Sequence, residues 1–215
     1  MDTSRQTAYR QNLKGLIIDV AMQCFYSNGI RNVKMDDIAK KLQISKRTLY
    51  ELYANKEELL LAGLKRDESA FEAQLQLFAD KKAHNAMEVV MKFFQMQMKR
   101  LATINPCFFM DLHKYGNVVA YLETIHAERN IRSIKFFQAG IKEDIFLKNL
   151  DYELISKLCD EMIRGAMEKE IYRVYGLQHI FQNIITVFVR GFATKKGLEV
   201  VDKYLESGNL NGSLF

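Results

Sequence analysis

The fold is decided by the stretch Asp36–Tyr50, DDIAKKLQISKRTLY. Its pattern predicts two short helices separated by a tight turn, with Ser45 as the N-cap of the second helix. Apolar residues at helical spacing can close the two helices on each other: Ile38, Ala39, Leu42, Ile44 and Leu49. The opposite face of the second helix carries cations and hydroxyl groups, which suit the major groove of DNA.

The flanking sequence predicts one more helix on each side of this pair. Apolar residues recur every three or four positions between about Tyr9 and Asn28, and Gly29 follows where a helix would end. Downstream, Asn55 and Glu58 have the spacing of a capping box that opens a fourth helix. We therefore expect residues 1–56 to form a helix-turn-helix head and residues 57–215 to form a larger helical domain.

Helical periodicity continues from Lys56 almost to the C-terminus. It predicts helices at about 56–79, 85–104, 106–115, 117–141, 151–174, 178–193 and 195–206. The chain has one proline and 11 glycines, and no stretch alternates strictly between apolar and polar residues. The predicted fold class is therefore all-α. We expect the tail Ser207–Phe215 to fray.

The positive charge of the chain is concentrated in the head. The 215 residues have a formal net charge of +5. Residues 1–56 contain ten Lys or Arg and five Asp or Glu, so they carry the whole excess, and the remaining residues are balanced. A surface that faces phosphates needs this asymmetry.

Cysteine usage and hydropathy indicate a cytoplasmic protein. The chain has an odd number of cysteines, far apart in the sequence: Cys24, Cys107 and Cys159. This favours buried thiols in a reducing compartment over disulfides or a metal site. The N-terminus has no apolar run typical of a signal peptide, and no apolar stretch reaches the ~20 residues that a membrane-spanning helix needs.

Three phrases of the sequence resemble the TetR family of bacterial transcriptional regulators. They are Gly29–Ala39 (GIRNVKMDDIA), Ile44–Tyr50 (ISKRTLY) and Tyr53–Leu59 (YANKEEL). The resemblance implies an all-α homodimer that binds a palindromic operator. It also implies that the C-terminal domain dimerises through two late helices and encloses a pocket, and that a small molecule bound there releases the operator.

The sequence departs from the family pattern at two places. The family usually has Thr or Ser at the start of its second helix, where this chain has Val33 and Lys34, so a side-chain cap is lost there. The turn between the second and third helices often carries Gly, where this chain has Gln43. These positions affect the local geometry and the operator sequence rather than the fold.

By this resemblance the recognition helix corresponds to Ser45–Leu52. The predicted DNA-binding residues are Lys34, Ser45, Lys46, Arg47, Thr48, Tyr50, Tyr53 and Lys56. Long cations at the start of the helix suit guanine edges or phosphates, and the hydroxyl groups suit the DNA backbone. Two alternatives stay open: adjacent cations are often only a solvated surface, and Tyr53 suits packing as well as phosphate binding.

Phenylalanine and methionine are concentrated between residues 85 and 141. Such residues fill any helical core, but they also repack around different ligands, so we consider an apolar or aromatic effector. The candidate ligand-binding residues are Phe94, Met98, Phe109, His113, His126 and Phe137. Candidate dimerisation stripes on two late helices are Leu154, Leu158, Met162, Ile163, Met167 and Ile171, then Ile180, Ile184, Ile185, Phe188 and Val189.

Two other classes of function compete with a ligand-released repressor. A di-iron enzyme would repeat the unit Glu-x-x-His, which occurs only at Glu123–His126, and motifs of zinc proteases or phosphate loops are missing. We therefore expect no enzyme, no catalytic or metal-ligating residue and no cofactor. The other rival is an architectural or partner-controlled DNA-binding protein without a small-molecule ligand.

Overall fold

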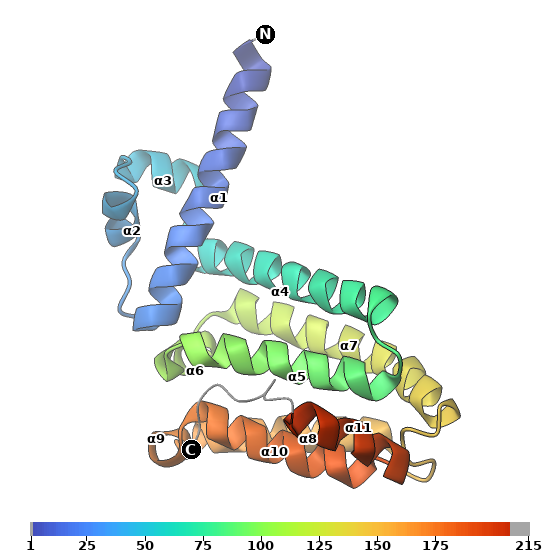
Figure 1. The fold of residues 1–215 in the computed structure, drawn as a ribbon. Helices are drawn as coiled ribbons and strands as arrows, with labels where there is room; N and C mark the ends of the chain where they lie inside the picture. The colour runs from blue at the N-terminus through green and yellow to red at the C-terminus, as the bar shows by residue number, and fades with distance from the viewer. Residues whose placement is uncertain (1, 207–215) are drawn as a thin grey trace. The chain divides into compact units, whose positions relative to one another are not determined.

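The computed structural model describes residues 2–206, with side chains from residue 7 onward. In this part the chain forms helices and no named strand (Figure 1). In chain order they are α1 (Asp2–Asn28), α2 (Met35–Lys41), α3 (Lys46–Leu52), α4 (Lys56–Lys81), α5 (Ala86–Thr103), α6 (Pro106–Leu112), α7 (Gly116–Lys142), α8 (Tyr152–Glu168), α9 (Tyr172–Tyr175), α10 (Leu177–Phe192) and α11 (Lys195–Glu206). The all-α prediction is confirmed, and the predicted fraying of Ser207–Phe215 lies outside the described residues.

Three turns end helices with a side-chain-bearing residue in the left-handed region. Gln43, Asp144 and Glu170 have φ of 54°, 59° and 53°. Each is the C′ residue of a Schellman motif; at the end of α2, for example, the Ile44 N–H donates to the Ala39 carbonyl and the Gln43 N–H to the Lys40 carbonyl, both at 3.1 Å. The single helix predicted over residues 151–174 was wrong for this reason, because Glu170 separates α8 from α9 without the glycine that usually marks such a break.

The first helix was also predicted too short. It begins at Asp2, although the apolar periodicity starts only near Tyr9. Residues 2–7 (DTSRQT) are all polar or charged, so hydrophobic spacing could not indicate the first turns. The three cysteines are free thiols, but Cys107 is exposed and Cys159 half-buried, so the expectation of burial holds only for Cys24.

The chain divides into two compact units. The first comprises residues 1–70 and 103–123, and the second comprises residues 71–102 and 124–215. The core of the first unit joins α1, α2, α3 and the start of α4 to α6 and the start of α7, with Ile17, Phe25, Ile38, Leu49 and Phe108 at most 1% exposed. The predicted boundary between a DNA-binding head of residues 1–56 and a larger domain of residues 57–215 stays a prediction.

The second unit has an aromatic core of its own. The rings of Phe137 and Tyr152 stack with centroids 4.3 Å apart, and Phe146 and Phe192 pack beside them. Gly140 is required here, because a Cβ at this position would lie 2.2 Å from the Phe146 ring. Among the described residues, no helix combines the length and the apolar character needed to span a membrane.

Candidate nucleic-acid interface

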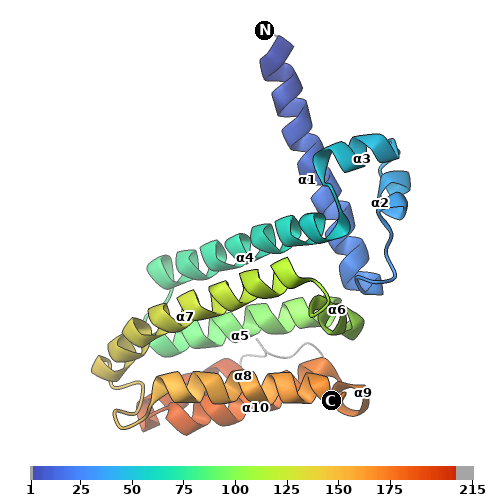
Figure 2. The same cartoon turned by 180° about the vertical axis from the view of Figure 1, so that it is seen from behind.

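The helix-turn-helix is closed by its apolar residues and capped at both sides of the turn. Ile38 of α2 and Leu49 of α3 are fully buried against α1, and α2 and α3 lie side by side in both views (Figures 1 and 2). The Ser45 hydroxyl accepts a hydrogen bond from the Thr48 N–H at 3.0 Å and lies 2.8 Å from the Thr48 hydroxyl. Ser45 and Thr48 therefore fix the first turn of the recognition helix.

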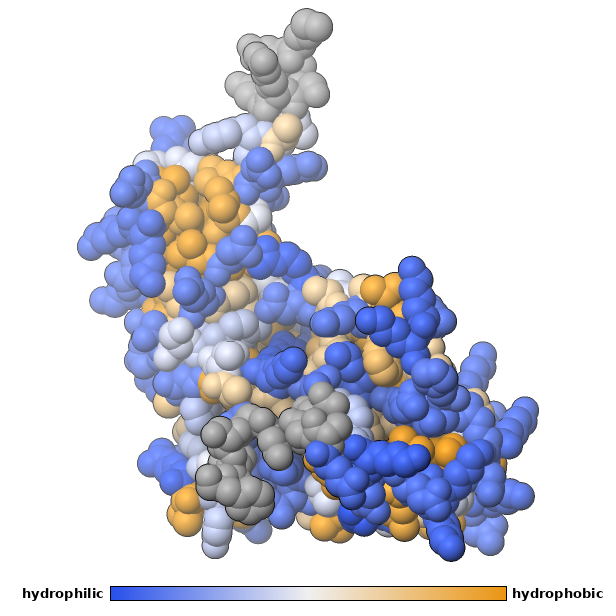
Figure 3. Space-filling model, viewed as in Figure 1, coloured by the Kyte–Doolittle hydropathy of each residue, from blue (hydrophilic) through white to orange (hydrophobic). Residues whose placement is uncertain are grey.

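The cations of α3 face solvent. The Arg47 side chain is 88% exposed and Lys46 and Tyr50 are exposed as well, in keeping with the hydrophilic outer edge over α2 and α3 in Figure 3. Lys46 pairs with Asp36, and the Arg47 Nε lies 2.8 Å from the Glu51 carboxylate. Hydrogen bonding to these carboxylates raises the pKa of both cations.

The start of α2 is capped by a different residue from the one that the family pattern supplies. Lys34 is exposed in the N-cap position, and its backbone N–H donates to the Asp37 carboxylate at 3.1 Å. The Asp37 N–H returns a bond to the Lys34 carbonyl at 3.1 Å. The Asp37 carboxylate thus satisfies the Lys34 N–H, the Lys34 carbonyl takes the N–H that a Thr or Ser side chain would accept, and the Lys34 ammonium is left on the surface.

Lys56 has a structural role that the sequence did not indicate. Its ammonium donates to the carbonyl oxygens of Ile30 at 2.9 Å and Val33 at 2.8 Å, in the loop between α1 and α2. Burial lowers the pKa of Lys56, and the nearby Asp111 carboxylate acts in the opposite direction. These bonds already engage the ammonium with the loop. Phosphate binding by Lys56 stays a prediction.

Tyr53 belongs to the core of the first unit. Its residue is 5% exposed, burial raises the pKa of its phenol, and the Lys14 ammonium lies 5.9 Å from the ring centroid. Of the eight predicted DNA-binding residues, the structure gathers Lys46, Arg47, Thr48 and Tyr50 on α3 and Ser45 at its N-cap. It leaves Lys34 on the surface and turns Tyr53 and Lys56 inward. Packing is thus the observed role of Tyr53.

The α6 segment supports the loop that precedes the helix-turn-helix. The buried Asp111 carboxylate accepts a hydrogen bond from the Arg31 N–H at 2.8 Å. The Asn105 N–H donates to the Tyr26 carbonyl at 2.7 Å, at the end of α1. Gly29 has φ of 79°, and a Cβ there would lie 3.0 Å from Cys107. Sequence spacing could not find these partners, because they are about 80 residues away along the chain.

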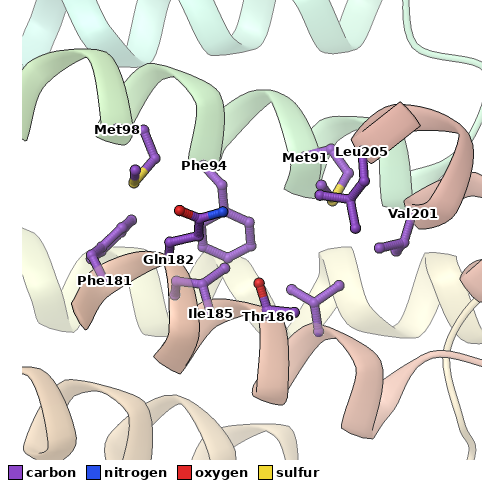
Figure 4. Close-up of a pocket in the computed structure, with 10 residues that line it drawn as sticks. Met91, Phe94, Met98, Phe181, Gln182, Ile185, Thr186, Val201 and Leu205 are labelled. Atoms are coloured by element: carbon purple, nitrogen blue, oxygen red, sulfur yellow. The ribbon is translucent and has the colours of Figure 1, made fainter. Parts of the chain in front are cut away.

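The predicted ligand-binding residues are not brought into one pocket. A small cavity of about 20 Å³ lies between α5, α10 and α11 (Figure 4), and among the predicted residues it is lined by Phe94 and Met98. Phe137 packs on Tyr152 instead, His126 is exposed, and Phe109 and His113 belong to the first unit. The lining residues that sequence reasoning did not select are Met91, Phe181, Gln182, Ile185, Thr186, Val189, Val201 and Leu205.

The candidate dimerisation stripes differ in exposure. On α8, Leu154, Leu158 and Met162 are spaced by four residues and are each about half exposed. On α10 the predicted stripe faces inward, because Ile184 and Val189 are buried and Ile185 lines the small cavity. Among the described residues, no three His, Cys, Asp or Glu side chains are grouped as metal ligands.

Comparisons with known proteins agree with this geometry. Residues 17–62 match the family model described as "Bacterial regulatory proteins, tetR family". An HTH-type transcriptional regulator of Staphylococcus aureus (strain MRSA252) is 26% identical over 192 residues, which cover 87% of this chain and 93% of the relative.

Solved structures share the fold at low sequence identity. A TetR-family regulator from Agrobacterium tumefaciens aligns with a TM-score of 0.69 at 13% identity, over 86% of this chain and 100% of that one. A regulator from Saccharomonospora viridis, solved in complex with choline, gives 0.68 at 16% identity over the same shares. SmeT, the repressor of a multidrug efflux pump of Stenotrophomonas maltophilia, gives 0.65 at 11% identity, over 85% and 91%.

The all-helical fold and the capped, cation-bearing α3 define a helix-turn-helix transcriptional regulator that binds DNA. Residues 17–62 carry the DNA-binding module of the TetR family. The chain as a whole is similar to transcriptional regulators of that family, which bind operator DNA and act as dimers.

Proposed function

We propose that the chain is a homodimeric repressor that reads a palindromic operator with α3. The observation that carries this proposal is the first turn of α3, where Lys46 and Arg47 project into solvent from a helix whose start is fixed by Ser45. A helix presented in this way enters the major groove with its N-terminal residues against base edges. Lys46 and Arg47 then contact guanine edges or phosphates, and Thr48 and Tyr50 contact the backbone.

The second subunit docks on the exposed face of α8. Leu154, Leu158 and Met162 form one stripe at a spacing of four residues, and Val187 of α10 is 68% exposed. Large apolar side chains exposed along one face of a helix are typical of an interface in which the same face of two subunits packs together. A dimer carries two copies of α3, and the half-sites of a palindrome read by such helices lie about one helical turn, or ~34–36 Å, apart.

The effector that we propose is a small molecule with an apolar or aromatic body, bound between α5, α10 and α11. Phe94, Met98 and Phe181 supply an apolar lining, and Gln182 and Thr186 supply polar groups. Two proteins of this fold, SmeT and the S. viridis regulator, were solved with triclosan and choline, respectively. The cavity must enlarge to hold such a molecule, since about 20 Å³ is room for roughly one water.

That small volume favours a second candidate function, in which the chain binds DNA under the control of a protein partner or as an architectural protein. The two candidates differ in their response to small molecules. Titration of an apolar compound set against the protein bound to DNA releases the complex only if the first candidate holds. Footprinting separates them again, because a regulator protects discrete sites beside a promoter and an architectural protein protects scattered sites.

The direct test of the proposed function is a gel shift with the DNA that flanks the protein's own gene, at two salt concentrations. We expect a shift that is specific for a palindromic segment, weakens steeply with salt, and has two chains per site. A matched variant, Arg47→Gln, removes one cation from α3 and is expected to reduce specific binding. No specific shift on the flanking DNA would count against an autoregulatory repressor, and a lack of salt-dependent binding to any duplex would contradict DNA binding. We expect the protein to act in the cytoplasm, where bacterial operators lie.

A further inference from the structure

The N-terminal turns of α1 extend away from the core of the first unit. From residue 7 onward, the first fully buried residue of α1 is Ile17, and Thr7, Ala8, Tyr9, Arg10, Gln11 and Asn12 are all exposed. At 1.5 Å per residue the segment from Thr7 to Leu16 is about 15 Å long. It projects past α3 in both views (Figures 1 and 2). We call Thr7–Leu16 the arm.

The arm carries positive charge without acidic residues to balance it. No Asp or Glu occurs between residues 3 and 18, and the next one, Asp19, is paired with Arg66 at 2.6 Å. Arg10 and Lys14 are one helical turn apart and lie on the face of α1 that continues into the buried residues Ile17 and Ala21. The face that packs the core therefore becomes a basic face where the core ends.

Two contacts place this basic face beside the recognition helix. An Arg10 guanidinium nitrogen donates to the backbone carbonyl of Glu51, near the end of α3, at 3.4 Å. The Lys14 ammonium lies 5.9 Å from the centroid of the Tyr53 ring, just after α3. Because the Glu51 carboxylate is 2.8 Å from the Arg47 Nε, Arg10 of the arm and Arg47 of α3 meet at the same residue.

We propose that Arg10 and Lys14 of the arm bind the phosphates of the DNA strand that borders the major groove occupied by α3. This inference rests on the proposed function, because it needs α3 in the groove. The groove is about 12 Å wide, so a helix that crosses α3 at its C-terminal end lies over the bordering backbone rather than over base edges. The 3.4 Å bond from Arg10 to a neutral carbonyl is weak and exposed, and a phosphate offers the guanidinium a stronger, charge-assisted bond.

Phosphate contacts also stabilise the helical conformation of the arm. A helical segment without a buried face is marginal in water and is held only as an extension of the packed helix behind it. Phosphates bonded along one side of the arm stabilise it without an apolar partner. The arm thus adds affinity without adding sequence preference, since phosphate contacts are shared by all sequences.

The test is the salt dependence of binding to a random-sequence duplex of about 30 base pairs, measured with the full chain by fluorescence anisotropy. Each phosphate contact contributes about 0.9 to the slope of log K against log salt. Arg10→Gln and Lys14→Gln are each expected to flatten the slope by about 0.9 per bound subunit, and to weaken operator and random DNA by the same factor. Lys65→Gln on α4 is the control and is expected to leave the slope unchanged.

A gain of charge gives a second readout, in which the variants add a cation to the arm and keep Arg10 and Lys14. Thr7→Lys adds a cation on the same face as Arg10 and Lys14, whereas Asn12→Lys adds one on the opposite face of the helix. Thr7→Lys is expected to steepen the slope and Asn12→Lys to change it by less than half as much. Circular dichroism and thermal unfolding of each variant check that the fold is kept.

The outcomes separate this inference from the proposed function. If the unaltered chain binds DNA with a steep salt dependence and the Arg10 and Lys14 variants match it, the arm does not contact phosphates and the proposed function stands. Equal effects of Thr7→Lys and Asn12→Lys would overturn the arm as well, because they indicate a general charge effect. If the unaltered chain binds no duplex, both are overturned.

Discussion

The Lys56 ammonium donates a hydrogen bond to the main-chain carbonyl of Val33 at 2.8 Å, and so ties the first residue of α4 to the loop that leads into α2. The same ammonium bonds the Ile30 carbonyl at 2.9 Å, and Asp111 holds the Arg31 N–H of this loop at 2.8 Å. The loop is therefore fastened from two sides by charged groups from later parts of the chain. Its geometry sets where α2 and α3 stand on α1.

Replacement of Lys56 separates its structural role from phosphate binding. Lys56→Met keeps most of the side-chain length and removes the bonds to the loop, so we expect the free energy of unfolding to fall by about 1.5–3 kcal/mol, the magnitude of hydrogen bonds to a charged group. Urea denaturation measures the loss, with Lys65→Met as a control. Salt titration of DNA binding then discriminates: an unchanged slope supports the structural role alone, and a slope reduced by about 0.9 per subunit assigns a phosphate to Lys56.

The left-handed residue in the helix-turn-helix can be relieved by glycine. Gln43 has φ of 54°, a conformation that costs a side-chain-bearing residue roughly 1 kcal/mol or more, partly offset by the greater entropy that glycine loses on folding. We expect Gln43→Gly to raise the free energy of unfolding by up to about 1 kcal/mol. Gln74→Gly, in the exposed interior of α4, is the matched control and is expected to lower it by about 1 kcal/mol. Destabilisation by Gln43→Gly would show that the Gln43 side chain makes a compensating interaction.

We expect the carboxylates that pair with the α3 cations to weaken non-specific DNA binding. Glu51→Gln removes the partner that lies 2.8 Å from the Arg47 Nε, so the guanidinium becomes available to phosphates and a negative charge leaves the interface. We expect tighter binding to a random-sequence duplex and a slope steeper by up to about 0.9 per subunit. Glu128→Gln on α7 changes the net charge equally and serves as control. If Glu51→Gln and Glu128→Gln bind the random-sequence duplex equally well, Glu51 does not weaken non-specific binding.

Dimerisation through α8 is tested by a charge in the centre of its exposed stripe. Leu158 is 49% exposed, so Leu158→Asp costs the isolated subunit little but places a charge in an apolar interface. We expect sedimentation velocity to change from dimer to monomer and operator binding to weaken sharply. Leu77→Asp on α4, where the residue is 54% exposed, is the control and leaves the dimer intact. Dimers that survive Leu158→Asp would place the interface on another face.

Local sequence patterns were sufficient for the architecture and for the centre of the site. The predicted cap at Asn55 forms, with the Glu58 N–H donating to the Asn55 side chain at 2.9 Å. The Glu58 carboxylate accepts from the Ala54 N–H at 2.7 Å, one residue before the N–H that a capping box predicts. Ser45, the buried Leu49 and the exposed cations of α3 also follow from spacing alone. These features depend on residues within one or two helical turns of each other, and such interactions are written in short stretches of chain.

The remaining features depend on partners far apart in the sequence. Asp111 reaches Arg31, Phe137 stacks on Tyr152 rather than on Phe94, and Lys56 turns to a loop more than twenty residues before it. A Phe, Met or Lys side chain is chemically suited to a core, a pocket or a phosphate alike, so its type does not select among them. The choice is made by which distant groups the packed helices bring within reach, and this is why Asp36–Tyr50 identified the DNA-binding helix but not the contacts that hold it in place.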